Sequence, residues 1–190
     1  MTDRIIAITG VPGSGKTTVL KNAISKAPNV SVVNFAEVML SVGAELGLGS
    51  DHDAIRTQPL DVQRDLQKKA AEKIAKDSKG VTIVDTHATI KTSAGYLPGL
   101  PQWILSALNP STIVIVESSP KDINFRRKMD KSRSRDDEGE AGIELHQSLN
   151  RAITLAYSAS SGATVKIITN EQNKLEEASK ELLDLFGGNK

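Results

Sequence analysis

A glycine-rich stretch near the N-terminus carries the residue types best suited to chemistry. The pattern G-x-x-x-x-G-K-[ST] is filled here by Gly10, Val11, Pro12, Gly13, Ser14, Gly15, Lys16 and Thr17. An apolar β-branched run precedes it and a helix-compatible stretch, 17–26, follows, which disfavours a chance glycine turn. Glycines let the backbone approach an anion, and the N–H groups and dipole of the following helix attract it. We therefore predict a nucleoside triphosphate site, with Lys16 at the β- and γ-phosphates and Thr17 as a ligand of Mg²⁺.

A carboxylate at the end of a second apolar run has the pattern of a metal-binding aspartate. Residues 81–84 are mostly apolar and are followed directly by Asp85. In phosphate-transfer enzymes such an aspartate holds Mg²⁺ directly or through water. A strand-terminal aspartate can also simply cap the next turn. With a phosphate-binding loop expected in the same sheet, we favour the metal role.

A cluster of basic residues forms the third candidate element. It comprises Arg126, Arg127, Lys128, Lys131, Arg133 and Arg135, and acidic residues follow over 136–140. Forked guanidinium groups suit phosphate oxygens, so the cluster favours a lid that closes over a triphosphate. A solvated charged hairpin and an RNA-binding segment are the alternatives. The acidic half and the lack of aromatic residues weaken the RNA interpretation.

The distribution of arginines suggests which group accepts the phosphoryl group. A hydroxyl acceptor benefits from a carboxylate base, whereas a monophosphate, with a second pKa of about 6, is already a nucleophilic dianion. The obstacle for a monophosphate acceptor is repulsion between its charge and that of the triphosphate, which cations beside both nucleotides relieve. Arg56 and Arg151 lie in two segments outside the cluster, and His87 follows Asp85 closely enough to line an acceptor pocket. If these segments converge, the pattern favours transfer between two phosphates.

Two further observations narrow the function. The guanine-specific motif N-K-x-D is absent, since its nearest match, 173–176, ends in Glu176 and opens a helix; this disfavours a GTPase switch. His146 falls on a predicted helix and is interpreted as structural, and no two of the three histidines have metal-ligand spacing.

The elements that must position these residues alternate between strand and helix. Apolar β-branched segments recur at 5–9, 30–35, 81–85, 112–117 and 164–169, with helical patterns between them. A stripe of Val62, Leu66, Ala70 and Ile74 predicts one of these helices, and 174–186 predicts the last. Residues 96–101 are expected to form a rigid, turn-rich loop. The pattern predicts a three-layer α/β sandwich around a five-stranded parallel sheet, in a single domain spanning 1–190.

Composition sets limits on partners and location. With no cysteine, the chain has no disulfide, thiolate nucleophile or cysteine-ligated zinc site. A net charge of +1 gives no electrostatic argument for a nucleic acid or membrane partner. The short apolar runs fit neither a secretory signal nor a membrane span, so we expect a soluble, cytoplasmic protein.

The chain resembles a known family, the archaeal-type adenylate kinases, a branch of the P-loop nucleoside monophosphate kinases. The motifs that carry the resemblance are 10–18, 34–39, 85–88, 95–101, 133–136 and 146–151. The stretches Asp-Thr-His at 85–87 and Gly-Tyr-Leu-Pro-Gly-Leu-Pro at 95–101 are the most particular to this branch.

The resemblance implies Mg²⁺-dependent exchange between ATP and AMP to give two ADP. It implies an AMP-binding segment at about 35–62, a short lid at about 126–142 without zinc, and frequent assembly as homotrimers. Its implied ATP-phosphate residues are 10–18, including Thr18. Its implied AMP-side residues are Arg56, Asp85, His87 and Lys91, and the implied phosphoryl clamp is Arg126, Arg133, Arg135 and Arg151.

Three alternatives remain at this stage. A kinase for another monophosphate, such as CMP or UMP, differs in pocket contacts that one sequence does not reveal. An adenylate-kinase-like ATPase acting as a ribosome-assembly factor would hydrolyse ATP without AMP. A nucleotide-binding regulator without turnover is disfavoured because the residues for catalysis are present.

Overall fold

A parallel sheet forms the centre of the molecule. The computed structural model describes residues 3–49, 51–130 and 138–187. Within them β1 (Arg4–Thr9), β2 (Val30–Asn34), β3 (Val81–Asp85), β6 (Thr112–Glu117) and β7 (Thr164–Thr169) pair in parallel, in the order β2-β3-β1-β6-β7. This arrangement confirms the predicted five-stranded parallel sheet.

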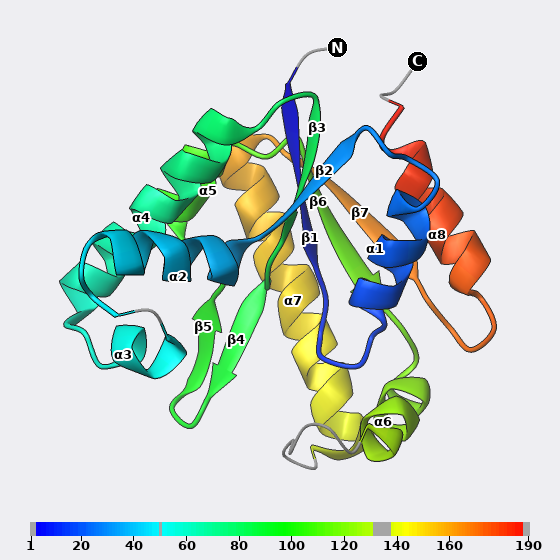
Figure 1. Ribbon diagram of the computed structural model, residues 1–190. Coiled ribbons are helices and arrows are strands. Elements are labelled where there is room, and N and C mark those ends of the chain that lie inside the picture. The colour runs from blue at the N-terminus through cyan, green and yellow to red at the C-terminus, as the bar shows by residue number, and fades with distance from the viewer. Residues whose placement is uncertain (1–2, 50, 131–137, 188–190) are drawn as a thin grey trace.

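Helices cover both faces of the sheet (Figure 1). Along β1, Ile5 and Ala7 join one hydrophobic core, whereas Ile6 and Ile8 join the other, because successive strand residues point to opposite faces. The first core includes residues of α2 (Phe35–Glu45), α4 (Leu60–Asp77), α5 (Gln102–Leu108) and α7 (Gly139–Ser161). The second includes residues of α1 (Lys16–Ile24) and α8 (Leu175–Asp184). The result is the expected three-layer sandwich.

Local sequence explains where the helices begin. The Asn34 side chain accepts hydrogen bonds from the N–H groups of Ala36 and Glu37, which caps α2 directly after β2. Ser119 caps α6 (Pro120–Met129) in the same way, with a proline in its first turn. The short helix α3 (His52–Arg56) is capped by Asp51. The caps at Asn34 and Ser119 place two helix starts near the carboxyl ends of β2 and β6, where α/β sheets bind ligands.

The predicted loop at 96–101 is wrong in its first part. β4 (Thr89–Thr92) and β5 (Gly95–Pro98) form an antiparallel hairpin that lies apart from the main sheet (Figure 1). The proline and glycines of this segment predicted a loop, but Pro98 sits at the end of a short strand, where it costs no ladder hydrogen bond. Two helix ranges also differ by one or two residues at each end: 17–26 is Lys16–Ile24 and 174–186 is Leu175–Asp184.

No helix in the part of the chain that the structure describes is both long and apolar enough to cross a membrane.

Candidate active site

The glycine-rich loop between β1 and α1 lies close against neighbouring backbone. Gly13 and Gly15 have φ angles of 91° and 87°, in the region that favours glycine. A Cβ on Gly10 would lie 2.6 Å from the Val116 carbonyl oxygen of β6. The Ser14 hydroxyl is buried and has no hydrogen-bond partner within the described residues. A tight cradle with an unpartnered polar group is the geometry expected of an anion site.

Lys16 and Asp85 meet at the carboxyl edge of the sheet. Lys16 Nζ donates a hydrogen bond to Asp85 Oδ1 and another, of 3.0 Å, to the Thr86 carbonyl oxygen. β1 and β3 are neighbours, with Ile8 opposite Asp85, so the two sequence motifs end side by side. Both side chains are mostly buried, at 13% and 15% exposed. The lysine is therefore held in place by the carboxylate next to the phosphate cradle.

The donor atoms here fit a magnesium ion. Thr17 is exposed in the first turn of α1, and Asp85 supplies carboxylate oxygens nearby. Mg²⁺ prefers oxygen ligands and usually combines one or two protein groups with waters and substrate phosphates. Within the described ranges, no group of three or more His, Asp or Glu side chains could hold a metal alone. This sparse donor set suits an ion that arrives with a nucleotide.

Two arginines of α6 bind the outside of the loop. Arg126 donates to the carbonyl oxygens of Ser14, at 3.2 Å, and Asn170, at 3.0 Å. Asn170, just after β7, donates in turn to Ser14 O at 2.9 Å. Arg127 Nε donates to the Pro12 carbonyl oxygen at 2.8 Å. Thus the sequence located the basic cluster but missed Asn170, which follows a strand without any motif of its own.

Arg151 and Arg56 are in different situations. Arg151 forms a forked pair with the buried Glu117 at the end of β6, at 2.8 and 2.9 Å. This hydrogen bonding raises the pKa of Arg151. Arg56 is 80% exposed on α3 and pairs with Asp53 at 3.6 Å, outside the contacts that gather the residues above. The predicted residues Arg133 and Arg135 lie outside the described part of the chain.

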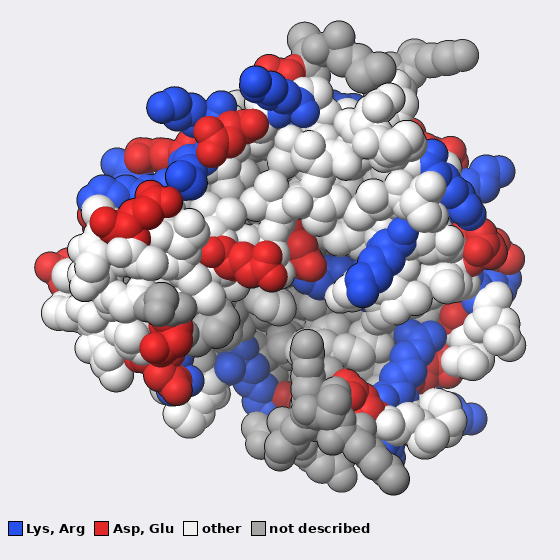
Figure 2. Space-filling view, viewed as in Figure 1, with Lys and Arg blue, Asp and Glu red and all other residues white. Residues whose placement is uncertain are grey.

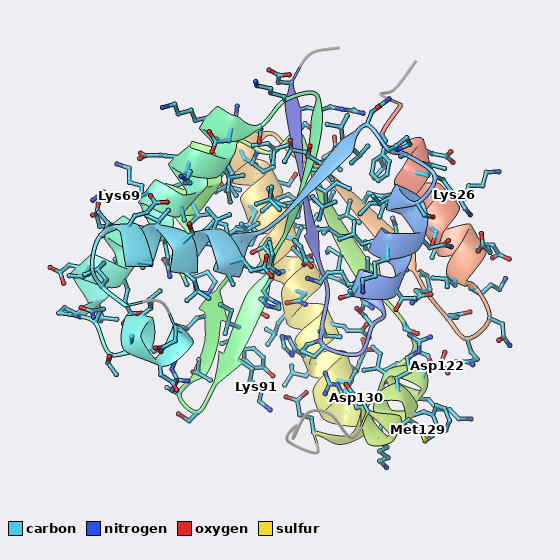
Figure 3. The ribbon with its side chains drawn as sticks, in the orientation of Figure 1. Lys26, Lys69, Lys91, Asp122, Met129 and Asp130 are labelled. Carbon is cyan, nitrogen blue, oxygen red and sulfur yellow. The ribbon has the colours of Figure 1, made fainter. Side chains whose placement is uncertain are left out.

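A cavity of about 250 Å³ opens beside the loop, on the side of the β4–β5 hairpin. Figure 2 shows basic and acidic side chains around the hollowed centre of this face. Figure 3 shows Lys91 on the hairpin, on the same side of the molecule as Met129, the last residue of α6, and the following Asp130. The cavity is lined by Pro12, His87, Thr89, Ile90, Lys91, Arg127, Glu138 and His146.

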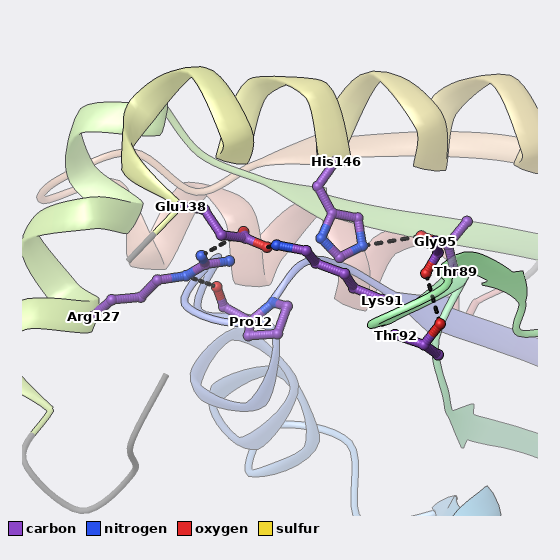
Figure 4. A network of polar contacts seen from close by, with 8 residues as sticks. All are labelled: Pro12, Thr89, Lys91, Thr92, Gly95, Arg127, Glu138 and His146. Atoms are coloured by element: carbon purple, nitrogen blue, oxygen red, sulfur yellow. Dashed lines mark hydrogen bonds and ion pairs between the residues drawn. The ribbon is translucent and has the colours of Figure 1, made fainter. Parts of the chain in front are cut away.

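Glu138 supplies the negative charge that pairs with both cations of this cavity. Its carboxylate pairs with Lys91 and with Arg127, the latter at 2.9 Å (Figure 4). Burial alone would raise the pKa of Glu138, but the hydrogen bonds from Lys91 and Arg127 outweigh it and lower that pKa. In the sequence, Glu138 stands out only as one member of a charged run.

Both histidines of the cavity have a lowered pKa. The pKa of His87 is lowered, first by desolvation against the cavity wall and then by the charge of Lys16, with Asp85 opposing the shift; the residue as a whole is exposed, which limits the effect. His146 is 5% exposed, and burial is the main cause that lowers its pKa. The cavity therefore combines two cations, one carboxylate and two imidazoles.

A lysine and an aspartate at a glycine cradle, on this strand order, define the P-loop class of nucleotide-binding proteins. A family model described as an AAA domain matches residues 9–144. Two solved structures of shikimate kinases share the fold. The enzyme from Bacteroides thetaiotaomicron has a TM-score of 0.55 at 17% identity and covers 98% of this chain and 99% of that one. The enzyme from Acinetobacter baumannii has a TM-score of 0.59 at 14% identity, and the match covers 100% of this chain and 96% of that one.

Curated relatives are much closer in sequence. The adenylate kinase of Methanothermobacter thermautotrophicus is 46% identical over 180 residues, 94% of this chain and 97% of that one. The adenylate kinase of Methanopyrus kandleri is 47% identical over 183 residues, which cover 95% of this chain and 96% of that one. The adenylate kinase of Thermoplasma volcanium is 48% identical over 176 residues, which cover 93% of this chain and 96% of that one. The chain belongs to the adenylate kinase family, which confirms the resemblance found in its motifs.

Proposed function

We propose that this protein catalyses the reversible, Mg²⁺-dependent transfer of a phosphoryl group from ATP to AMP, giving two ADP. The observation that supports this most directly is the Lys16–Asp85 pair at the phosphate cradle, next to a cavity that also contains Lys91 and Arg127. Two polyanions can meet only where cations face both of them.

On the donor side, residues 10–18 hold the ATP phosphates. Lys16 leaves or shares its contact with Asp85 to reach the β- and γ-phosphates, and Thr17 and Asp85 would hold Mg²⁺, Asp85 through water. The ion supplies neutralisation of phosphate charge when it is bound. Arg126 keeps the loop in shape through Ser14. No covalent intermediate is needed, because positioning and charge neutralisation supply the catalysis.

On the acceptor side, Arg56, Asp85, His87 and Lys91 face AMP, whose phosphate dianion needs no protein base. We assign the AMP-binding segment to about 35–62. Arg56 reaches AMP only if this segment moves, since its side chain is paired with Asp53 on the surface.

Around the transferring group, Arg126, Arg133, Arg135 and Arg151 form the clamp, within and beside a lid at about 126–142. Arg151 comes from α7 and is oriented by Glu117, a carboxylate that fixes its fork toward the end of β6. Closure excludes water, which would otherwise compete as acceptor.

We also propose a cytoplasmic location and assembly as a homotrimer, both from the family resemblance. Light scattering coupled to size-exclusion chromatography measures the assembly directly. A monomeric mass at micromolar concentration would refute the trimer.

Mixing the purified protein with Mg·ATP and AMP and separating the nucleotides by chromatography tests the activity. ADP should appear only when both nucleotides and Mg²⁺ are present, and AMP should be used in preference to CMP, UMP and GMP. Hydrolysis of ATP at the same rate without AMP would refute the proposal and favour an ATPase.

A further inference from the structure

Helix α7 carries a stripe of buried polar residues that all bind the same segment of the chain. His146, Asn150 and Tyr157 are each buried, and their spacing of four and seven residues places them on one side of the helix. The Tyr157 hydroxyl donates to the Ala88 carbonyl oxygen at 2.9 Å and accepts from the Leu100 N–H at 3.3 Å. Buried polar groups are costly unless they are paired. Here the pairs join α7 to both ends of the β4–β5 hairpin.

A hydrogen-bonded chain at Thr89 fixes the start of the hairpin. The Thr89 hydroxyl donates to Asn150 Oδ1 at 2.6 Å, and His146 Nε2 lies 3.0 Å from the same hydroxyl oxygen. A hydroxyl has a single proton, and here it goes to Asn150, so Thr89 Oγ1 accepts from His146 Nε2–H. Burial lowers the pKa of His146, and Arg127 and Lys91 lower it further against the opposing charge of Glu138.

His146 also contacts the second strand of the hairpin. Its ring meets Tyr96 edge-on, with centroids 5.0 Å apart. Tyr96 pairs with Lys91 in the antiparallel register, and Thr89 is two residues from Lys91 on the same strand. Thr89, Lys91 and Tyr96 therefore share one face of the hairpin. From this face Lys91 extends to Glu138 beside the phosphate loop (Figure 4).

The phosphate loop itself is held by other groups. Its carbonyl oxygens are bound by Arg126, Arg127 and Asn170, which come from α6 and the end of β7. The polar chain at Thr89 contains none of them. Disturbing that chain should thus displace the hairpin more than the phosphate loop.

We propose that Thr89 and His146 are positioning residues for the acceptor side of the transfer site, acting through the hairpin that carries Lys91. This inference rests on the proposed function, in which Lys91 faces AMP. The Asn150–Thr89–His146 chain sets the place of Lys91, and loss of the chain weakens the acceptor's binding while that of ATP is retained.

The decisive variant is Thr89→Val, which keeps the shape of the side chain and removes its hydroxyl. We expect KM for AMP to rise about tenfold, the effect of one buried hydrogen bond, with KM for ATP changed less than about twofold. Thr89→Ser restores the hydroxyl and should restore KM for AMP. Thr154→Val is the matched control: Thr154 is buried on α7, and its hydroxyl has no partner within the described residues.

A rise in both Michaelis constants by the same factor would overturn the proposal, as would a loss of kcat alone. So would equal effects of Thr89→Val and Thr154→Val, or a failure of Thr89→Ser to rescue. If Thr89→Val does not fold, Asn150→Leu, which removes the acceptor of the same chain, is read by the same criteria. Failure of the wild-type protein to make ADP would instead refute the proposed function, so the two failures are distinct.

Discussion

Replacing Gly99 by alanine tests whether backbone packing beneath the cavity sets the geometry of the acceptor side. Gly99 follows β5 directly, and its N–H donates to the Ala88 carbonyl oxygen at 2.8 Å. An added Cβ would lie 2.0 Å from the His87 carbonyl oxygen and 2.7 Å from its carbonyl carbon. Ordinary contacts between such atoms are about 3.5 Å, so the two backbones must separate by more than about 1 Å. Neither neighbour is a flexible side chain that could turn away.

The expected costs follow from that displacement. Overpacking of this kind lowers the free energy of unfolding by about 1–3 kcal/mol. A shift of about 1 Å at a reacting geometry lowers kcat/KM for AMP by about a hundredfold. Urea unfolding and initial-rate assays at saturating ATP measure the two effects. Gly187→Ala is the control, because its Cβ would meet no atom closer than Asp184 O at 3.9 Å. Gly99→Ala with the stability and kcat/KM of the wild-type protein would refute the reasoning.

Three further predictions concern charges. Lys16→Ala should lower kcat/KM by at least about a hundredfold, roughly 2.7 kcal/mol of transition-state stabilisation, and retention of half the activity would contradict the assignment. Glu138→Gln removes the negative charge that Lys91 and Arg127 share, so an anion should bind beside these cations more tightly. Inorganic phosphate should therefore inhibit ADP formation about fivefold more strongly than in the wild-type protein. Glu140→Gln is the control, and unchanged inhibition of Glu138→Gln would contradict the prediction. Burial lowers the pKa of His146 in the folded protein below the ordinary value of a histidine, so the unfolded chain binds a proton at this residue first as pH falls below about 6.5. The free energy of unfolding should therefore decrease by up to about 1.4 kcal/mol per pH unit there, more steeply than in His146→Gln; identical slopes in urea melts would refute this.

The sheet and the donor side could be predicted because their signals are local. β-branched runs identify buried parallel strands, and the glycine motif fixes a loop whose shape depends mainly on its own residues. The contact between Lys16 and Asp85 then follows from strand order.

The acceptor side could not be predicted in the same way. The contact of Thr89 with His146 joins residues 57 positions apart, and neither has a motif. The β4–β5 hairpin was missed because Pro98 and Gly99 indicate a loop when tertiary context is ignored. Glu138 was one acidic residue among several, and only packing shows that it is the one that bridges two cations.

The order β3-β1-β6 has a consequence for how precisely the reacting groups are spaced. Asp85 ends β3, the phosphate loop follows β1, and Glu117 ends β6; these three strands are adjacent, and neighbouring strands in parallel sheets lie about 4.8 Å apart. The hydrogen bonds between these strands therefore set the spacing of the three points. Elements at the surface, such as α6 with Arg126 and Arg127, can bring cations to this edge without having to define its dimensions.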